Sequence, residues 1–148
     1  MSLLEQLTKE IKSAMLARDA DRLSTLRLLK SAIGYVQIER KTDALSDLDV
    51  IAVIQKEIKK RHDSVEQYDK GGRPELAARE KQEITVLESF LPQPLSSGEL
   101  EQLVRAAIQE AGATSRKEMG AVIKTVQAKA AGRADGKSIS ALVGRLLS

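Results

Sequence analysis

The chain has 148 residues, of which 42% are hydrophobic and 30% charged, and its formal net charge is +3. It contains no cysteine, which excludes disulfides, thiolate nucleophiles and cysteine-ligated metals. It has neither a run of 18 apolar residues nor the pattern of a signal peptide, so we expect a cytoplasmic protein with no membrane segment.

Aromatic residues are scarce: the sequence has only Tyr35, Tyr68 and Phe90. Proteins that hold unpaired nucleotides stack the bases on aromatic rings, and three scattered rings cannot form such a platform. If a nucleic acid is a partner, we therefore expect it to be held by its backbone and shape.

Apolar residues at three- and four-residue steps predict helices in the first forty residues. The first covers residues 3–18, with its inward face formed by Leu4, Leu7, Ile11 and Met15. The second covers residues 23–40 and follows Asp19 or Asp21 as N-cap. Its apolar side consists of Leu23, Leu26, Leu29, Ile33 and Val36.

Two further helices are expected before residue 91. Ser46 with Asp49 forms a capping-box pattern that begins a long third helix, which reaches Tyr68. Two glycines in KGGRPE end it, and Pro74 suits the first turn of a fourth helix, which runs to about Phe90. The inward side chains of this fourth helix are expected to be Leu76, Ile84 and Leu87.

The stretch LPQPLSSGE interrupts the helical pattern with two prolines, two serines and a glycine. We therefore predict an all-α protein with a helical domain over residues 1–91, a linker over 92–98 and a compact three-helix tail over 99–148. In the tail, Ser96–Glu99 and Ser115–Glu118 are expected capping boxes, and Gly112 and Gly132 are expected helix ends.

The excess of positive over negative charge is confined to the tail. Residues 1–98 carry 16 Lys/Arg and 16 Asp/Glu and are neutral, whereas residues 99–148 carry 8 basic and 5 acidic residues. This asymmetry points to the tail as the part that faces an anionic partner.

The residues offer no catalytic constellation. His62 is the only histidine and lies in a charged helical stretch, so we expect a solvated side chain and no metal or cofactor site. GRADGKS lacks the first glycine and the preceding strand of a phosphate-binding loop. Lys56, Lys59 and Lys60 form a basic stripe, flanked by Glu57 and Arg61, which is expected to be a solvated face with local ion pairs.

The turn AAGRADGKSIS near the C-terminus allows two interpretations. The free N–H groups at the start of the last helix, with Gly136 allowing close approach and with Arg133 and Lys137 beside it, form a natural anion site. Alternatively, the glycines end one helix and Asp135 caps the next. The two interpretations are compatible.

Three segments together carry a family resemblance: KKRHDSVEQYDKGGRPELAAREKQEI, LESFLPQPLS and GATSRKEMGAVIKTVQAKAAGRADGKSISALVGRLL. They closely resemble the bacterial YqeY-like proteins over nearly the whole chain. That family shares its helical and tail domains with the B subunit of the tRNA-dependent Asp/Glu amidotransferase, a carbon–nitrogen ligase that uses glutamine as amido donor.

The resemblance implies that the tail faces tRNA. It carries a nucleic-acid-binding role over to Lys124, Lys129, Arg133 and Lys137, and we add Gly136, which lets a phosphate approach the start of the last helix closely. Because the catalytic cradle of the amidotransferase has no counterpart here, no catalytic residue is carried over, and we expect a non-catalytic tRNA-binding module. Two alternatives stay open: an accessory component of an amidotransferase or another aminoacyl-tRNA-related protein, docked through an apolar groove in residues 1–90, and a protein–protein adaptor without RNA binding.

Overall fold

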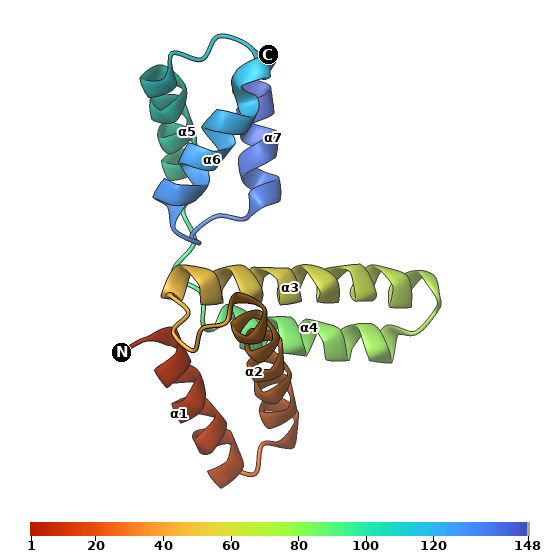
Figure 1. Cartoon of the computed structure of the whole chain (residues 1–148). Helices are drawn as coiled ribbons and strands as arrows, with labels where there is room; N and C mark the ends of the chain where they lie inside the picture. Colours follow the sequence, from red (N-terminus) through yellow and green to blue (C-terminus); the bar gives the residue numbers. More distant parts are fainter. Residues whose placement is uncertain (148) are drawn as a thin grey trace. The chain divides into compact units, whose positions relative to one another are not determined.

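The computed structural model of the protein describes residues 1–147, and every regular element in that range is a helix (Figure 1). The chain is all-α, as predicted. It divides into two compact units, Met1–Leu91 and Pro92–Ser148, which we call the N-terminal unit and the C-terminal unit. The N-terminal unit contains α1 (Leu3–Leu16), α2 (Ala20–Arg40), α3 (Asp47–Lys70) and α4 (Pro74–Glu88). The C-terminal unit contains α5 (Ser97–Ala111), the 3-10 turn η1 (Arg116–Glu118), α6 (Met119–Ala130) and α7 (Gly136–Leu146).

Local capping chemistry places most helix ends where the sequence predicts them. Both halves of the capping box form at Ser46 with Asp49 and at Ser96 with Glu99. Asp19, and not Asp21, caps α2, because its carboxylate accepts the Arg22 N–H at 3.1 Å.

One predicted capping box is wrong. Ser115 makes no side-chain cap, and the Glu118 carboxylate accepts the Thr114 N–H at 3.0 Å instead. The cause is the 3-10 turn η1, which delays the start of α6 to Met119 and so removes Ser115 from the N-cap position. At its other end α6 is capped by Ala131 in the left-handed conformation, one residue before the predicted Gly132.

The N-terminal unit consists of two helical hairpins, α1–α2 and α3–α4, with α2 also packed on α4 (Figure 1). Its core is aliphatic apart from one ring. The buried cluster comprises Leu7, Ala14, Leu26, Leu29, Ile33, Leu45, Val50, Val53, Ile54, Leu87 and Phe90. Burying this surface is the main driving force for folding the unit.

Two inward side chains were predicted one residue out of phase. Met15 is 52% exposed while the preceding Ala14 is buried, and Leu76 is 37% exposed while the following Ala77 is buried. Each residue turns the helix by about 100°. Near a helix end a small residue can therefore face the core while the larger apolar residue next to it in sequence faces solvent.

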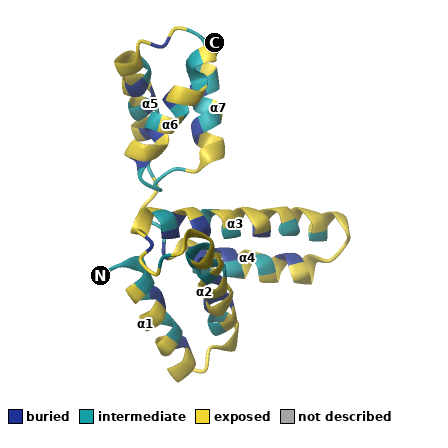
Figure 2. Ribbon diagram, viewed as in Figure 1, coloured by how far each residue is buried: buried dark blue, intermediate teal, exposed yellow. Residues whose placement is uncertain are grey.

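The far part of the α3–α4 hairpin extends beyond this core. After Arg61, α3 has no buried side chain, and Figure 2 shows that this part of α3 is exposed or intermediate, whereas α4 still buries Ala77 near the turn. Arg61 itself is only 8% exposed, contrary to the expectation that it flanks a solvated face. Its guanidinium is enclosed by Glu57 of α3 and Glu83 of α4, with Nε 3.2 Å from the Glu83 carboxylate.

The C-terminal unit packs α5, α6 and α7 around its own aliphatic core. The fully buried members come from all three helices and include Val104, Val122, Val126, Ile139 and Val143. The unit is small, so its stability depends on this core and on well-formed helix ends.

Candidate nucleic-acid interface

The seam between α6 and α7 and the adjoining first turn of α7 hold three of the five residues assigned to nucleic-acid binding. A Cβ added to Gly136 would lie 3.6 Å from Gln127 Nε2, so the start of α7 faces the end of α6. Lys124 lies three residues before Gln127 and therefore on the same side of α6. Lys137 directly follows Gly136. Lys124 and Gly136 thus line the seam, and Lys137 projects about 100° away from Gly136 around α7, in the first turn of that helix.

Both lysines of this seam are exposed. Within residues 1–147 neither ammonium group has a hydrogen-bond or ion-pair partner. The side chains between them are small: Gly136, Ser140 and Gly144 recur at four-residue steps on the face of α7 that meets α6. Because no bulky side chain stands in between, the backbone of an anionic polymer can come close to this surface and to both lysines.

The N-terminus of α7 is already capped by a side chain. The Asp135 carboxylate accepts the Ser138 N–H at 2.6 Å. A carboxylate at this position satisfies one of the free amides and places negative charge beside the helix dipole. The capping interpretation of the turn is therefore the one that the structure contains, and an anion at the seam would be held mainly by the lysines.

Arg133 has a structural partner. Its Nε donates to the Gln93 carbonyl at 2.9 Å, and its own carbonyl accepts the Leu95 N–H at 2.8 Å. These two bonds tie the segment that precedes α5 to the turn that joins α6 and α7. Hydrogen bonding with Ser96 lowers the pKa of Glu99, and the positive charge of the half-buried Arg133 guanidinium adds a smaller effect in the same direction.

Lys129 points to α5 and not to the seam. Its Nζ lies 2.6 Å from the Glu110 carboxylate, and this hydrogen bond holds the pKa of Glu110 below its ordinary value. The structure therefore separates the five assigned residues into a seam group of three and two residues that hold helices and linker in place.

A further cation at the seam was not identified from the sequence. Arg116, in η1, donates through Nη2 to the Gly144 carbonyl at 3.3 Å, at the end of α7 away from Gly136. A Cβ on Gly144 would meet Met119 Cε at 3.4 Å, which confirms that α7 runs antiparallel to α6 there. The eight-residue spacing of Gly136 and Gly144 in the sequence indicates a small-residue face on α7. It does not locate Arg116, because the 3-10 turn η1 that positions this residue was not predicted.

The other residues considered from the sequence lie in the N-terminal unit. Lys56, Lys59 and Lys60 are exposed, and Lys60 pairs with Glu57 at 3.2 Å. His62 is exposed, as predicted. Across residues 1–147 no group of three or more histidine or carboxylate side chains is arranged to hold a metal ion. Nor is any helix in that range long and apolar enough to cross a membrane.

Comparison with known proteins identifies a family. The family described as "Yqey-like protein" matches residues 4–147. An uncharacterized protein of Schizosaccharomyces pombe is 38% identical over 89 residues, which cover 60% of this chain and 72% of that protein. "Altered inheritance of mitochondria protein 41, mitochondrial" of Vanderwaltozyma polyspora is 33% identical over 57% of this chain and 46% of its own length.

The relative of the same name in Pyrenophora tritici-repentis is 24% identical over 86% of this chain and 72% of its own length. The match to several of the mitochondrial relatives spans about half of their length. Because their name places those proteins in mitochondria, the cytoplasmic location expected for this chain is not confirmed and stays a prediction.

Proposed function

This chain belongs to the YqeY-like family, and we propose that it is a non-catalytic module that binds the backbone of tRNA through its C-terminal unit. The observation that carries the proposal is the α6–α7 seam, where Lys124 and Lys137 are exposed and unpaired on either side of small residues. The whole positive excess of the chain lies in this unit.

Composition supports a backbone contact over base recognition. All three aromatic residues precede residue 92, so the C-terminal unit has no ring on which an unpaired base could stack. Lysine binds phosphate as a point charge and needs no specific base. The expected complex is therefore sensitive to salt, with an affinity on the order of micromolar at physiological ionic strength.

Lys124 and Lys137 are proposed as the phosphate ligands, and Gly136 as the position that lets the backbone come close. Arg133 and Lys129 support the surface indirectly, through Gln93 and Glu110. This division matters for mutagenesis, because reversing the charge of Arg133 would also break the linker contact.

The test is fluorescence anisotropy of the full chain with a labelled tRNA transcript at two salt concentrations. We expect Lys124→Glu/Lys137→Glu to weaken binding at least tenfold and to reduce the salt dependence, since two phosphate contacts are lost. Lys56→Glu/Lys59→Glu is the matched control: it makes the same change in net charge on exposed residues of the N-terminal unit and should bind as the wild type does.

Equal losses in both double variants would reduce the interaction to general electrostatic attraction and would contradict a seam site. Absence of binding by the wild-type chain would contradict the proposal as a whole. The adaptor alternative would then be favoured, in which the net charge serves solubility alone.

A further inference from the structure

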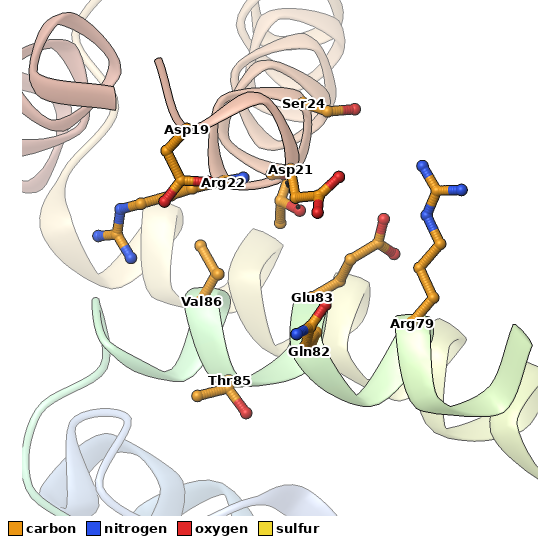
Figure 3. A pocket seen from close by; sticks show the side chains of 10 residues that line it. Asp19, Asp21, Arg22, Ser24, Arg79, Gln82, Glu83, Thr85 and Val86 are labelled. Carbon is orange, nitrogen blue, oxygen red and sulfur yellow. Dashed lines mark hydrogen bonds between the residues drawn. The ribbon is translucent and has the colours of Figure 1, made fainter. Parts of the chain in front are cut away.

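The N-terminal unit contains a polar cleft. It lies between the start of α2 and one face of α4 and has a volume of about 310 Å³ (Figure 3). Ten residues line it: Asp19, Asp21, Arg22, Ser24, Thr25, Arg79, Gln82, Glu83, Thr85 and Val86. This volume suits a small ligand.

About half of the lining groups already have partners within the unit. The Asp19 carboxylate caps α2, and Arg22 pairs with Glu10 at 2.9 Å. The hydroxyls of Thr25 and Thr85 donate to the carbonyls of Asp21 and Lys81, each at 3.1 Å. These contacts fix the four side chains as walls of the cleft.

Glu83 is held in a defined position on the α4 wall. Its carboxylate accepts from Arg61 Nε at 3.2 Å, and its side chain is only 19% exposed. Because a carboxylate has two oxygens that each accept more than one hydrogen bond, this contact leaves acceptor capacity toward the cleft.

Two further opposite charges face this space, although the charge of Arg79 also acts on the neighbouring Glu80. Asp21 belongs to α2 and Arg79 to α4, and both are exposed. In the described part of the chain neither forms an ion pair with the other or with any other residue. Figure 3 shows the carboxylates of Asp21 and Glu83 and the guanidinium of Arg79 pointing into the same space, from the two walls of the cleft. The Asp21 carboxylate, the remaining acceptor capacity of Glu83 beside Arg61 and the Arg79 guanidinium complement a small molecule that carries both charges.

We propose that this cleft binds the zwitterion of a free α-amino acid. The ammonium group of the ligand lies between the carboxylates of Asp21 and Glu83, and its carboxylate accepts from the Arg79 guanidinium, which matches carboxylate geometry through paired N–H donors. The amide of Gln82 and the hydroxyl of Ser24 are left for a short polar side chain. This site lies wholly in the N-terminal unit and does not depend on RNA binding.

The mixed charge distinguishes this ligand class from simpler ones. A lone cation would make no contact with the Arg79 guanidinium, and a lone anion would be repelled by the Asp21 carboxylate. A ligand with one charge therefore gains charge-assisted contacts with one wall only. The charged groups of the other wall repel it or make no contact with it.

The test uses ¹⁵N-labelled full-length protein and two-dimensional NMR titration with glycine, L-serine and L-glutamine. We expect saturable amide shifts confined to the start of α2 and to the stretch of α4 around Arg79 and Glu83, with a Kd between roughly 0.1 and 10 mM, as befits a ligand of few atoms. Ethylamine and propionate, which carry one charge each, should bind at least tenfold more weakly.

Variants separate the two walls. Asp21→Asn and Arg79→Gln should each weaken binding of the amino acids about tenfold or more, because each removes one charge-assisted contact. Asp63→Asn and Arg73→Gln change the same residue types elsewhere in the unit and should leave the Kd unchanged. Far-UV circular dichroism of all four variants checks that the helices are intact.

Three results would overturn the proposal. The first is a lack of saturation with any amino acid up to about 50 mM, which lies beyond the expected range. The second is ethylamine binding as tightly as glycine, which would make this a cation site only. The third is an unchanged Kd in Arg79→Gln. None of these results bears on tRNA binding by the C-terminal unit, so the two proposals fail independently.

Discussion

The two units are built from the same element, the amphipathic helix, but they distribute charge in opposite ways. The N-terminal unit is neutral overall and buries Arg61 between Glu57 and Glu83. The C-terminal unit carries the positive excess and leaves Lys124 and Lys137 exposed without partners. In the N-terminal unit a buried cation joins two helices. In the C-terminal unit, by contrast, unpaired cations are available to an external anion.

The difference can be measured because the aromatic residues report on one unit only. Tyr35, Tyr68 and Phe90 all belong to the N-terminal unit, so tyrosine fluorescence follows its unfolding alone. Far-UV circular dichroism follows the helices of both units. Comparing the two signals assigns each destabilisation to a unit.

The largest effect is expected from breaking the buried ion-pair network. Arg61→Ala should lower the free energy of unfolding of the N-terminal unit by about 3 kcal/mol, because it leaves the poorly solvated Glu83 carboxylate without a cation and Glu57 with the exposed Lys60 alone. The measurement is urea denaturation followed by tyrosine fluorescence. Lys60→Ala, one residue earlier and exposed, is the control and should change stability by less than about 0.5 kcal/mol.

The pH dependence of that variant sharpens the assignment. Burial and the charge of Glu83 already raise the pKa of Glu80, and the charge of Arg61 opposes this shift. Without Arg61 the pKa of Glu80 should rise further above its unfolded-state value, so part of the lost stability is regained as the pH falls. A cost for Arg61→Ala that is equal at pH 7 and pH 5 would show that lost packing of the side chain, and not charge, is responsible.

A smaller effect is expected from a helix cap in the C-terminal unit. Ser96→Ala removes the hydroxyl that accepts the Glu99 N–H at 3.1 Å and should cost about 1 kcal/mol. The loss should appear in far-UV circular dichroism and leave the tyrosine transition unchanged. Ser97→Ala, at the first helical position, is the matched control; an equal loss there would contradict the capping role.

The smallest effect concerns the contact between α5 and α6. Lys129 lowers the pKa of Glu110 from 4.5, so the stability from this pair is complete above that value and is lost as the pH falls through the folded-state pKa. Lys129→Gln should therefore melt below the wild type at pH 7, and the two melting curves should converge at about pH 3, where Glu110 is protonated in both proteins. Parallel curves at all pH values would show that the ion pair is not the cause.

Local chemistry in the sequence accounts for most of the fold. Ser46, Ser96 and Asp19 are followed three residues later by the groups that they cap, and Gly71 and Gly112 stand at helix ends, so the elements and most of their boundaries could be predicted. The errors at Ser115 and Ala131 occur where a 3-10 turn and a left-handed non-glycine residue intervene. Such local departures arise from packing of the unit, and no periodic pattern of apolar residues in the sequence indicates them.

The candidate sites were predictable only in part. The sequence itself determined an all-α chain, its helices and a positive excess confined to the last third, because propensity, capping and charge are properties of near neighbours. Tertiary structure alone decided that Arg133 binds the linker, that Lys129 pairs with Glu110, and that Arg61 is buried. It also placed Asp21 opposite Arg79. The physical reason is that a long cationic side chain can reach partners in any direction, and which partner it meets depends on helices that the sequence separates by tens of residues.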